Sequence, residues 1–237
     1  MTLVVGLQGK EGVVLASDSQ GTHGEIRQSQ TKLFKTDYGL IWGLAGPFAA
    51  AQDLYTSLEE ADLKANPGRE VTKSTIREAM LATAGDLRTG TGQAPRFEGL
   101  FAWYDAASGR HYLLWARQDG HVEFERPFGA IGSGSVLGRF GFARSEFLEF
   151  GTLSLELTKM VTHMVAEEAV KASPKGVDLP IQIATASHGE THVLRRSEVS
   201  AIEDTVAFFR ESQRELLLTS DAPPAEGGIG GLRPGPG

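Results

Sequence analysis

Four residues in the first fifth of the chain have the types and order needed for catalysis by an N-terminal nucleophile. They are Thr2, Asp18, Lys32 and Gly46. A threonine hydroxyl is a weak nucleophile near neutral pH and needs a base to take its proton. If Met1 is removed, Thr2 carries both the hydroxyl and a free α-amine. The reference pKa of that amine, about 7.7–8.0, makes it a usable base after a modest decrease.

The other three residues would tune that base and bind the charge that develops. A lysine ammonium near the amine lowers the pKa of the amine, because like charges disfavour protonation, and a carboxylate beside the lysine keeps the lysine charged. Lys32 and Asp18 fit these two roles. A backbone N–H, here that of Gly46, can bind the oxyanion that forms when the hydroxyl attacks a carbonyl. Small residues after methionine favour its removal, and threonine is small enough.

The elements that must position these residues follow from hydrophobic periodicity and turn composition. Short Val- and Leu-rich runs between Gly- and Asp-containing turns predict strands. These runs cover residues 2–8, 12–18, 32–35, 40–46, 97–104, 111–116, 121–124, 181–186 and 191–194. Longer segments predict helices. They cover residues 49–60, 75–87, 136–147, 153–172 and 200–217.

The order of these elements indicates the fold class. The strands gather in hairpins rather than alternating with helices, which favours antiparallel sheets with segregated helices. We therefore expect an α+β fold, and a four-layer αββα sandwich of two antiparallel sheets flanked by helices is compatible with the pattern. The predicted domain covers residues 1–218. The Pro- and Gly-rich tail over residues 219–237 cannot bury a core, so we expect it to be disordered.

Composition argues against several classes of protein. The net charge of -7 disfavours nucleic acid or anionic membrane as a partner. Without cysteine the chain has no disulfide and no thiolate metal site, and its six histidines lack ligand spacing, so we expect no metal and no other cofactor. The N-terminus lacks a signal-peptide pattern, and no apolar stretch approaches the ~20 residues needed to cross a bilayer. The expected location is the cytoplasm.

Several segments in register resemble those of proteasome beta-type subunits, which are N-terminal-nucleophile hydrolases. The matching segments are Thr2–Gly6, Gly12–Ser19, Lys32–Lys35, Leu44–Gly46, Ala51–Gln52 and Ile131–Ser135. The last of them reads Ile-Gly-Ser-Gly-Ser and is similar to a later Gly-Ser-Gly-Ser motif of the family. The resemblance covers residues 2–218 and implies the αββα sandwich fold of the family. A leader of Met1 alone resembles the simplest bacterial members.

The resemblance implies roles for the four residues above and for three more. Thr2 would be the nucleophile, Lys32 and Asp18 its tuning pair, and the Gly46 N–H the oxyanion hole. Ser133 would form a hydrogen bond near the Thr2 amine. The family places an Asp and a Ser near that amine just before the strand expected over 181–186, and the candidates here are Ser173 and Asp178.

The same resemblance implies how a substrate would bind. The backbone at Thr22 and Gly46 would hold the substrate as an added strand. The pocket for the side chain before the cut bond would be lined by Gly21, Thr31, Leu44 and Phe48. Because this pocket would be mostly apolar, we expect a preference for hydrophobic residues there.

Three functions remain open from the sequence. The first is a threonine endopeptidase that forms a homo-oligomeric ring and cleaves unfolded proteins or peptides, with an ATPase or an alpha-type ring as further partners. The second is a ring subunit that keeps the fold without activity. The third is an N-terminal-nucleophile amidohydrolase that acts on small amides. The Thr2, Asp18 and Lys32 set favours the first.

Overall fold

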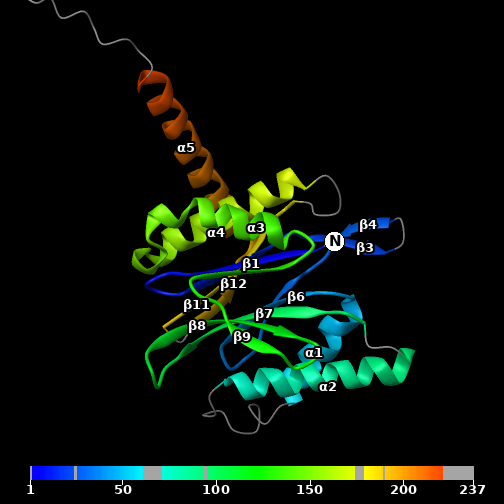
Figure 1. Ribbon diagram of the computed structural model, residues 1–237. Coiled ribbons are helices and arrows are strands. Elements are labelled where there is room, and N and C mark those ends of the chain that lie inside the picture. The colour runs from blue at the N-terminus through cyan, green and yellow to red at the C-terminus, as the bar shows by residue number, and fades with distance from the viewer. Residues whose placement is uncertain are drawn as a thin grey trace, which may run out of the picture.

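The structure is a computed structural model that describes residues 2–23, 26–60, 71–92, 95–173, 179–188 and 190–220. Two five-stranded antiparallel sheets pack face to face, and helices cover the outer face of each sheet (Figure 1). This is the α+β, four-layer αββα sandwich predicted from the sequence. The layers matter for function because they bring the ends of strands from both sheets to one edge of the sandwich.

The first sheet has the strand order β10-β1-β2-β11-β12. Its strands are β1 (Leu3–Gln8), β2 (Val13–Ser17), β10 (Phe128–Gly132), β11 (Gln182–Ser187) and β12 (Glu190–Val193). The opening hairpin β1–β2 is confirmed, and both strands are almost wholly buried. Because β1 and β2 are covered on both faces, they read as continuous apolar runs rather than as alternating ones.

The second sheet has the order β5-β6-β7-β8-β9. Its strands are β5 (Leu33–Lys35), β6 (Leu40–Ala45), β7 (Glu98–Asp105), β8 (Arg110–Arg117) and β9 (Val122–Phe124). A separate two-stranded ribbon consists of β3 (Gln20–His23) and β4 (Ile26–Ser29). The ribbon was not predicted, because its strands are short and polar and lack the apolar alternation that marks a strand in the sequence.

Five helices and two short 3-10 turns complete the described chain. The helices are α1 (Phe48–Glu60), α2 (Lys73–Thr91), α3 (Ser135–Arg144), α4 (Leu155–Ala172) and α5 (Arg196–Ser220), and the 3-10 turns are Glu146–Leu148 and Phe150–Thr152. All five predicted helices are present with shifted ends. Helix α2 is longer than predicted because Thr72 caps its first turn and Gly92, at a φ of 77°, caps its last.

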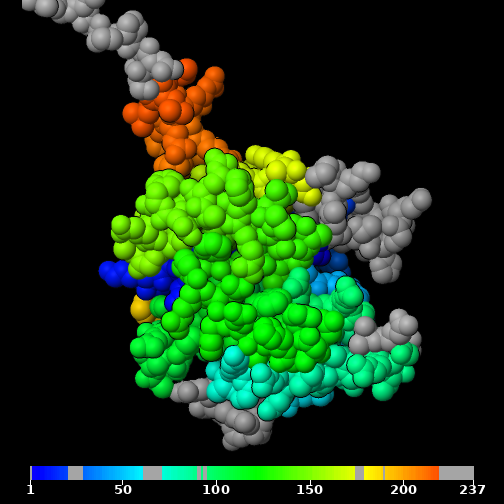
Figure 2. Space-filling view, in the orientation of Figure 1, coloured from blue at the N-terminus to red at the C-terminus, as the bar shows by residue number. Residues whose placement is uncertain are grey.

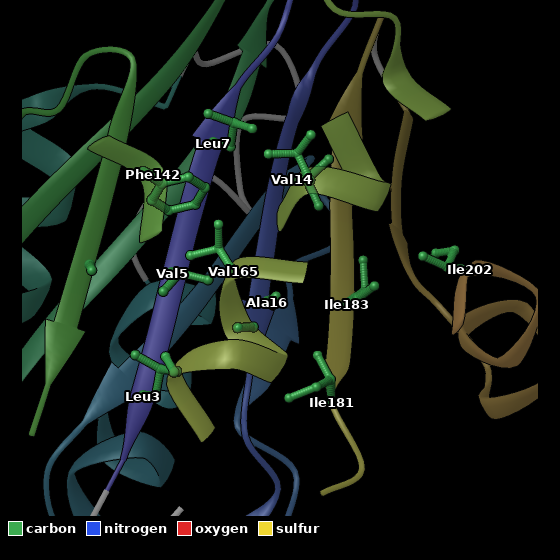
Figure 3. Close-up of a cluster of buried hydrophobic side chains, with 14 of the residues drawn as sticks. Leu3, Val5, Leu7, Val14, Ala16, Phe142, Val165, Ile181, Ile183 and Ile202 are labelled. Atoms are coloured by element: carbon green, nitrogen blue, oxygen red, sulfur yellow. The ribbon is translucent and has the colours of Figure 1, made fainter. Parts of the chain in front are cut away.

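Three apolar clusters fill the spaces between the four layers. One cluster lies between the first sheet and helices α3, α4 and α5, where Val5 and Leu7 meet Phe142 and Val165 (Figure 3). A second lies between the second sheet and helices α1 and α2 and is centred on the fully buried Trp42. The third lies between the two sheets. Burial on both faces of both sheets fixes the strand ends firmly relative to one another.

Helix α5 departs from this compact arrangement. It packs on α4 as far as Arg210, which pairs with Glu167, and its end projects away from the sandwich, as the orange-red helix in Figures 1 and 2 shows. Its outer half exposes Phe208 and the run Leu216–Leu218 to between 66% and 76%. The helix ends at Ser220, and residues 221–237 of the predicted tail lie outside the described residues.

Candidate active site

Thr2 lies at the start of β1, beside the turn that follows β10. Strand β1 pairs with β10 so that Leu3 lies opposite Gly132, which places Thr2 next to Ser133. The Thr2 N–H donates to Ser133 Oγ at 3.2 Å. The Ser133 hydroxyl and the Gly134 N–H both donate to the Thr2 carbonyl oxygen, each at a donor–acceptor distance of 3.4 Å. The backbone of Thr2 is therefore held on one side by the turn after β10.

Gly132 must be a glycine for this turn to approach Thr2. Its φ is +87°, a conformation in which residues with a Cβ are strained. A Cβ placed there would lie 2.2 Å from the Thr2 carbonyl oxygen, far inside van der Waals contact. The Gly-Ser-Gly-Ser run is thus more than a flexible connection, because its first glycine lets the chain pass against the backbone of Thr2.

On its other side, β1 is held by Asp18, which is fully buried. Asp18 Oδ1 accepts the Leu3 N–H at 2.8 Å, and Oδ2 accepts the Gln20 N–H at 3.1 Å. The Lys32 ammonium lies 2.8 Å from Oδ1 and 2.7 Å from Oδ2. The Lys32 ammonium and the Leu3 nitrogen are each 2.8 Å from the same oxygen, so they lie no more than twice that distance apart.

The electrostatics of this ion pair combine two opposing effects. Burial lowers the pKa of the Lys32 ammonium below its ordinary value, because the charged form is desolvated. The Asp18 carboxylate opposes that decrease through its charge and its hydrogen bonds. Since the Lys32 side chain is only 7% exposed, the pair must stay together or leave a charge without compensation inside the protein.

The ion pair links the two sheets. Asp18 follows β2 of the first sheet, and Lys32 precedes β5 of the second sheet. Gln182, on β11, fixes the segment that carries Lys32. Its Oε1 accepts the Lys32 backbone N–H at 3.0 Å, and its Nε2 donates to the Gln30 carbonyl at 2.6 Å. This role was not predicted, because Gln182 and Lys32 are 150 positions apart in the sequence.

Gly46 follows β6 and faces the same space as Thr2. Both line a cavity of about 780 Å³ at the edge of the sandwich. Its other lining residues are Ala45, Arg96, Phe97, Glu98, Arg117, Gln118, Gly132 and Ser133. A Cβ at Gly46 would lie 2.5 Å from Phe97 Cβ, so glycine is needed for β6 to end this close to its neighbour. The geometry brings Thr2, Gly46 and Ser133 together around one solvent-accessible space.

A comparison with protein families identifies the family to which the chain belongs. Residues 2–179 match the family model described as "Proteasome subunit". The chain belongs to the proteasome subunit family. The match agrees with a beta-type subunit, and membership of the proteasome family implies a ring-forming subunit that acts on substrates within an oligomeric assembly. A search of curated proteins found no match.

The resemblance to proteasome subunits also suggested Ser173 and Asp178 as support for the amine. Ser173 lies at the end of α4, where its backbone N–H donates to the Val170 carbonyl at 3.2 Å. Asp178 lies outside the described residues. Within the described residues, the Thr2 N–H donates to Ser133 Oγ.

The residues predicted to bind substrate come from three parts of the chain around Asp18, Lys32 and Gly46. Gly21 and Thr22 are in β3, and the exposed Thr31 directly precedes Lys32. Leu44 is only 6% exposed and packs into the cluster between the second sheet and its helices, while Phe48 begins α1 and is 45% exposed. Among the described side chains, Thr31, Leu44 and Phe48 do not line the 780 Å³ cavity.

Glu98 is a residue of the site that the sequence did not reveal. Its Oε1 accepts the Gly132 N–H at 2.9 Å, and its Oε2 accepts the Trp115 indole N–H at 2.9 Å. Glu98 therefore anchors the turn that carries Ser133 to the second sheet. A glutamate at the start of a strand has no distinctive spacing, so only the packing of the two sheets identifies it.

No helix among residues 2–220 that the structure describes is long and apolar enough to span a membrane. Within the same described ranges, no group of three or more His, Cys, Asp or Glu side chains could hold a metal ion.

Proposed function

We propose that this proteasome subunit is a threonine endopeptidase whose nucleophile is Thr2 after removal of Met1. One observation carries the proposal. The Asp18 carboxylate binds both the N–H of Leu3, the residue after Thr2, and the Lys32 ammonium. A single buried carboxylate thus holds the start of the mature chain and a cation side by side. A structural ion pair alone would not need to include the backbone of β1.

The chemistry begins with proton transfer within Thr2. The α-amine takes the proton of the Thr2 hydroxyl as the oxygen attacks the carbonyl carbon of the substrate. The nearby Lys32 ammonium keeps the amine in its neutral, basic form, because a second positive charge there would be repelled. Ser133 Oγ, 3.2 Å from the Thr2 nitrogen, orients the amine through a hydrogen bond.

The attack produces a tetrahedral intermediate with a negative oxygen. In our proposal the Gly46 N–H donates to this oxyanion, in a site that lies beside Thr2 and opens on the cavity. The C–N bond of the substrate then breaks, and the protonated Thr2 amine gives its proton to the departing amine. The remaining ester on Thr2 is hydrolysed by a water molecule that the amine deprotonates, which restores the free hydroxyl.

The first test is chemical modification of the N-terminal residue. The intact mass of the purified protein should show loss of Met1. A β-lactone or a peptide boronate should then form an adduct that peptide mapping locates on Thr2. The Thr2→Ala variant should lose Met1 as well, because alanine is also small, and should form no adduct. Retained Met1 together with no adduct would refute the peptidase proposal and favour a ring subunit without activity.

The second test separates a peptidase from an amidohydrolase of small molecules. The wild-type protein should cleave a denatured protein such as reduced, alkylated casein, while Thr2→Ala should not. Labelling of Thr2 without cleavage of casein or of any peptide would favour the amidohydrolase.

We also propose that the chain assembles into a homo-oligomeric ring. Light scattering of the purified protein should then give a mass several times the 25.4 kDa of one chain.

A further inference from the structure

The cavity beside Thr2 carries more positive charge than the rest of this acidic protein would suggest. Two of its lining side chains are Arg96, just before β7, and Arg117, the last residue of β8. The whole chain has a net charge of -7. The two arginines that line the cavity next to the proposed nucleophile therefore have the opposite sign to the net charge of the molecule.

The position of the cavity relative to Thr2 indicates which part of a substrate it would hold. In the second sheet β6 lies between β5 and β7, so Gly46 has Lys32 on one side and Glu98 on the other. In the first sheet β1 lies between β2 and β10, so Thr2 has Asp18 on one side and Gly132 on the other. Both sheets thus put the cavity on the side away from the ion pair.

Three of the residues expected to bind the substrate adjoin the ion pair along the chain. Gly21 and Thr22 are in β3, which begins two residues after Asp18, and Thr31 directly precedes Lys32. A peptide that runs past Thr2 in an extended form must leave on the opposite side. The cavity therefore lies where it can bind the substrate residues that follow the cut bond. These residues form the leaving segment, the part of the substrate released when the bond breaks.

The charges that line the cavity are not equivalent. Glu98 is negative, but both of its oxygens accept hydrogen bonds, from Gly132 and from Trp115. Arg117 forms an ion pair with Asp119 at 3.0 Å, and both side chains are about half exposed, so this pair is weak. Arg96 is exposed and has no ion pair within the described part of the chain.

These observations leave Arg96 as the cation with its charge and hydrogen-bond donors available. The guanidinium group presents planar donors that match a carboxylate. We propose that the cavity binds the leaving segment of the substrate and that Arg96, assisted by Arg117, selects a carboxylate there. This proposal rests on the proposed peptidase function and names the substrate class of the same site. The carboxylate comes either from an acidic side chain or from the C-terminus of the substrate.

Binding to the Thr2→Ala variant tests the proposal without relying on catalysis. Three fluorescent peptides would be compared that are identical except for Glu, Gln or Lys in the two positions after the intended cut. The Glu peptide should bind about five times more tightly than the Lys peptide, the ratio expected for one exposed charge pair. Adding Arg96→Glu should abolish or reverse that preference. Adding Arg110→Glu, the same charge change at the exposed, opposite end of β8, should leave it unchanged.

Cleavage of the same three sequences as internally quenched peptides should follow the same order in kcat/KM with Thr2 intact. A second pair of peptides, ending two residues after the cut as a free acid or as an amide, distinguishes the two sources of the carboxylate. Faster cleavage of the free acid indicates the C-terminus, and equal rates indicate the acidic side chain.

The outcomes separate this proposal from the peptidase function itself. If the Glu peptide binds preferentially and Arg96→Glu removes this preference, the anion subsite is supported. This holds even if Thr2 of the wild-type protein forms no β-lactone adduct and the peptidase function fails. Equal binding of the three peptides, or a preference that Arg96→Glu and Arg110→Glu change to the same extent, overturns the subsite while leaving labelling of Thr2 intact.

Discussion

Replacing Asp18 with asparagine is expected to destabilise the protein strongly, because every acceptor site of this buried carboxylate is in use. It accepts N–H groups from Leu3 and Gln20 and both oxygens contact the Lys32 ammonium. The asparagine amide has one oxygen and an NH2 group, so one N–H or ammonium donor would face another donor. Lys32 would also remain buried without an opposite charge.

The size of the effect follows from the burial of the pair. Removing one partner of a buried ion pair costs about 3–5 kcal/mol in free energy of unfolding. For a chain of this length that corresponds to a decrease in Tm of roughly 6–20 °C. Breaking an exposed ion pair should cost much less free energy of unfolding. Glu156 contacts Lys159 at 2.6 Å, but its side chain is 77% exposed, so Glu156→Gln should cost less than about 1 kcal/mol.

Thermal and urea unfolding followed by circular dichroism would measure both variants under identical conditions. A double variant makes the measurement specific to the ion pair. Lys32→Met removes the charge with little change in length, so Asp18→Asn combined with Lys32→Met no longer buries an unpaired ion. The double variant should therefore be clearly more stable than the sum of the two single effects predicts.

Two results would refute this reasoning. The first is an Asp18→Asn variant no less stable than Glu156→Gln, which would mean that the carboxylate is not a structural anchor of β1. The second is exact additivity in the double variant, which would mean that Asp18 and Lys32 do not interact in solution. A decrease in stability of the expected size also implies loss of cleavage, because the start of the mature chain would no longer be held beside the lysine.

Three further predictions concern neighbouring residues. Gly132→Ala should cost about 2 kcal/mol or more in stability and remove peptidase activity, because the new Cβ combines an unfavourable φ with overlap of the Thr2 carbonyl. Glu98→Gln can still accept the Gly132 N–H but sets an NH2 group against the Trp115 indole N–H, so kcat should decrease about ten-fold while the protein remains folded. The alkaline decrease of kcat/KM should occur below pH 10.5, because burial lowers the pKa of Lys32 and the active form carries its proton.

Each of these predictions has a control that isolates its cause. Gly39 also has a positive φ, 89°, but nothing lies within 4 Å of a Cβ there, so Gly39→Ala should show the cost of φ alone. A kcat of Glu98→Gln equal to that of the wild type would remove Glu98 from the positioning of Ser133. Lys32→Arg keeps its proton throughout, and an alkaline limb that does not move in this variant would assign that limb to another group.

The hairpins that frame the site could be predicted because their signals are local. Val-rich runs with Gly- and Asp-containing turns between them identify strands from neighbouring residues only, and the structure confirms β1, β2, β5 and β6. The polar ribbon β3–β4 was missed for the same reason, since its residues lack a local apolar pattern. The order of the residue types along these hairpins pointed to Thr2, Asp18, Lys32 and Gly46 as one chemical set, and the resemblance added Ser133.

By itself, therefore, the sequence determined an α+β fold of antiparallel hairpins with segregated helices and pointed to the residues proposed to react, because residue types and hydrophobic periodicity depend on short stretches of chain. The four-layer order was implied by the resemblance to the family. Tertiary structure alone decided which groups hold those residues in place. Glu98 and Gln182 act across contacts that span 34 and 150 positions, and such contacts exist only after the sheets have packed. The same packing collects Arg96 and Arg117 around one cavity beside Thr2, since strands that are distant in sequence end at a common edge of the sandwich.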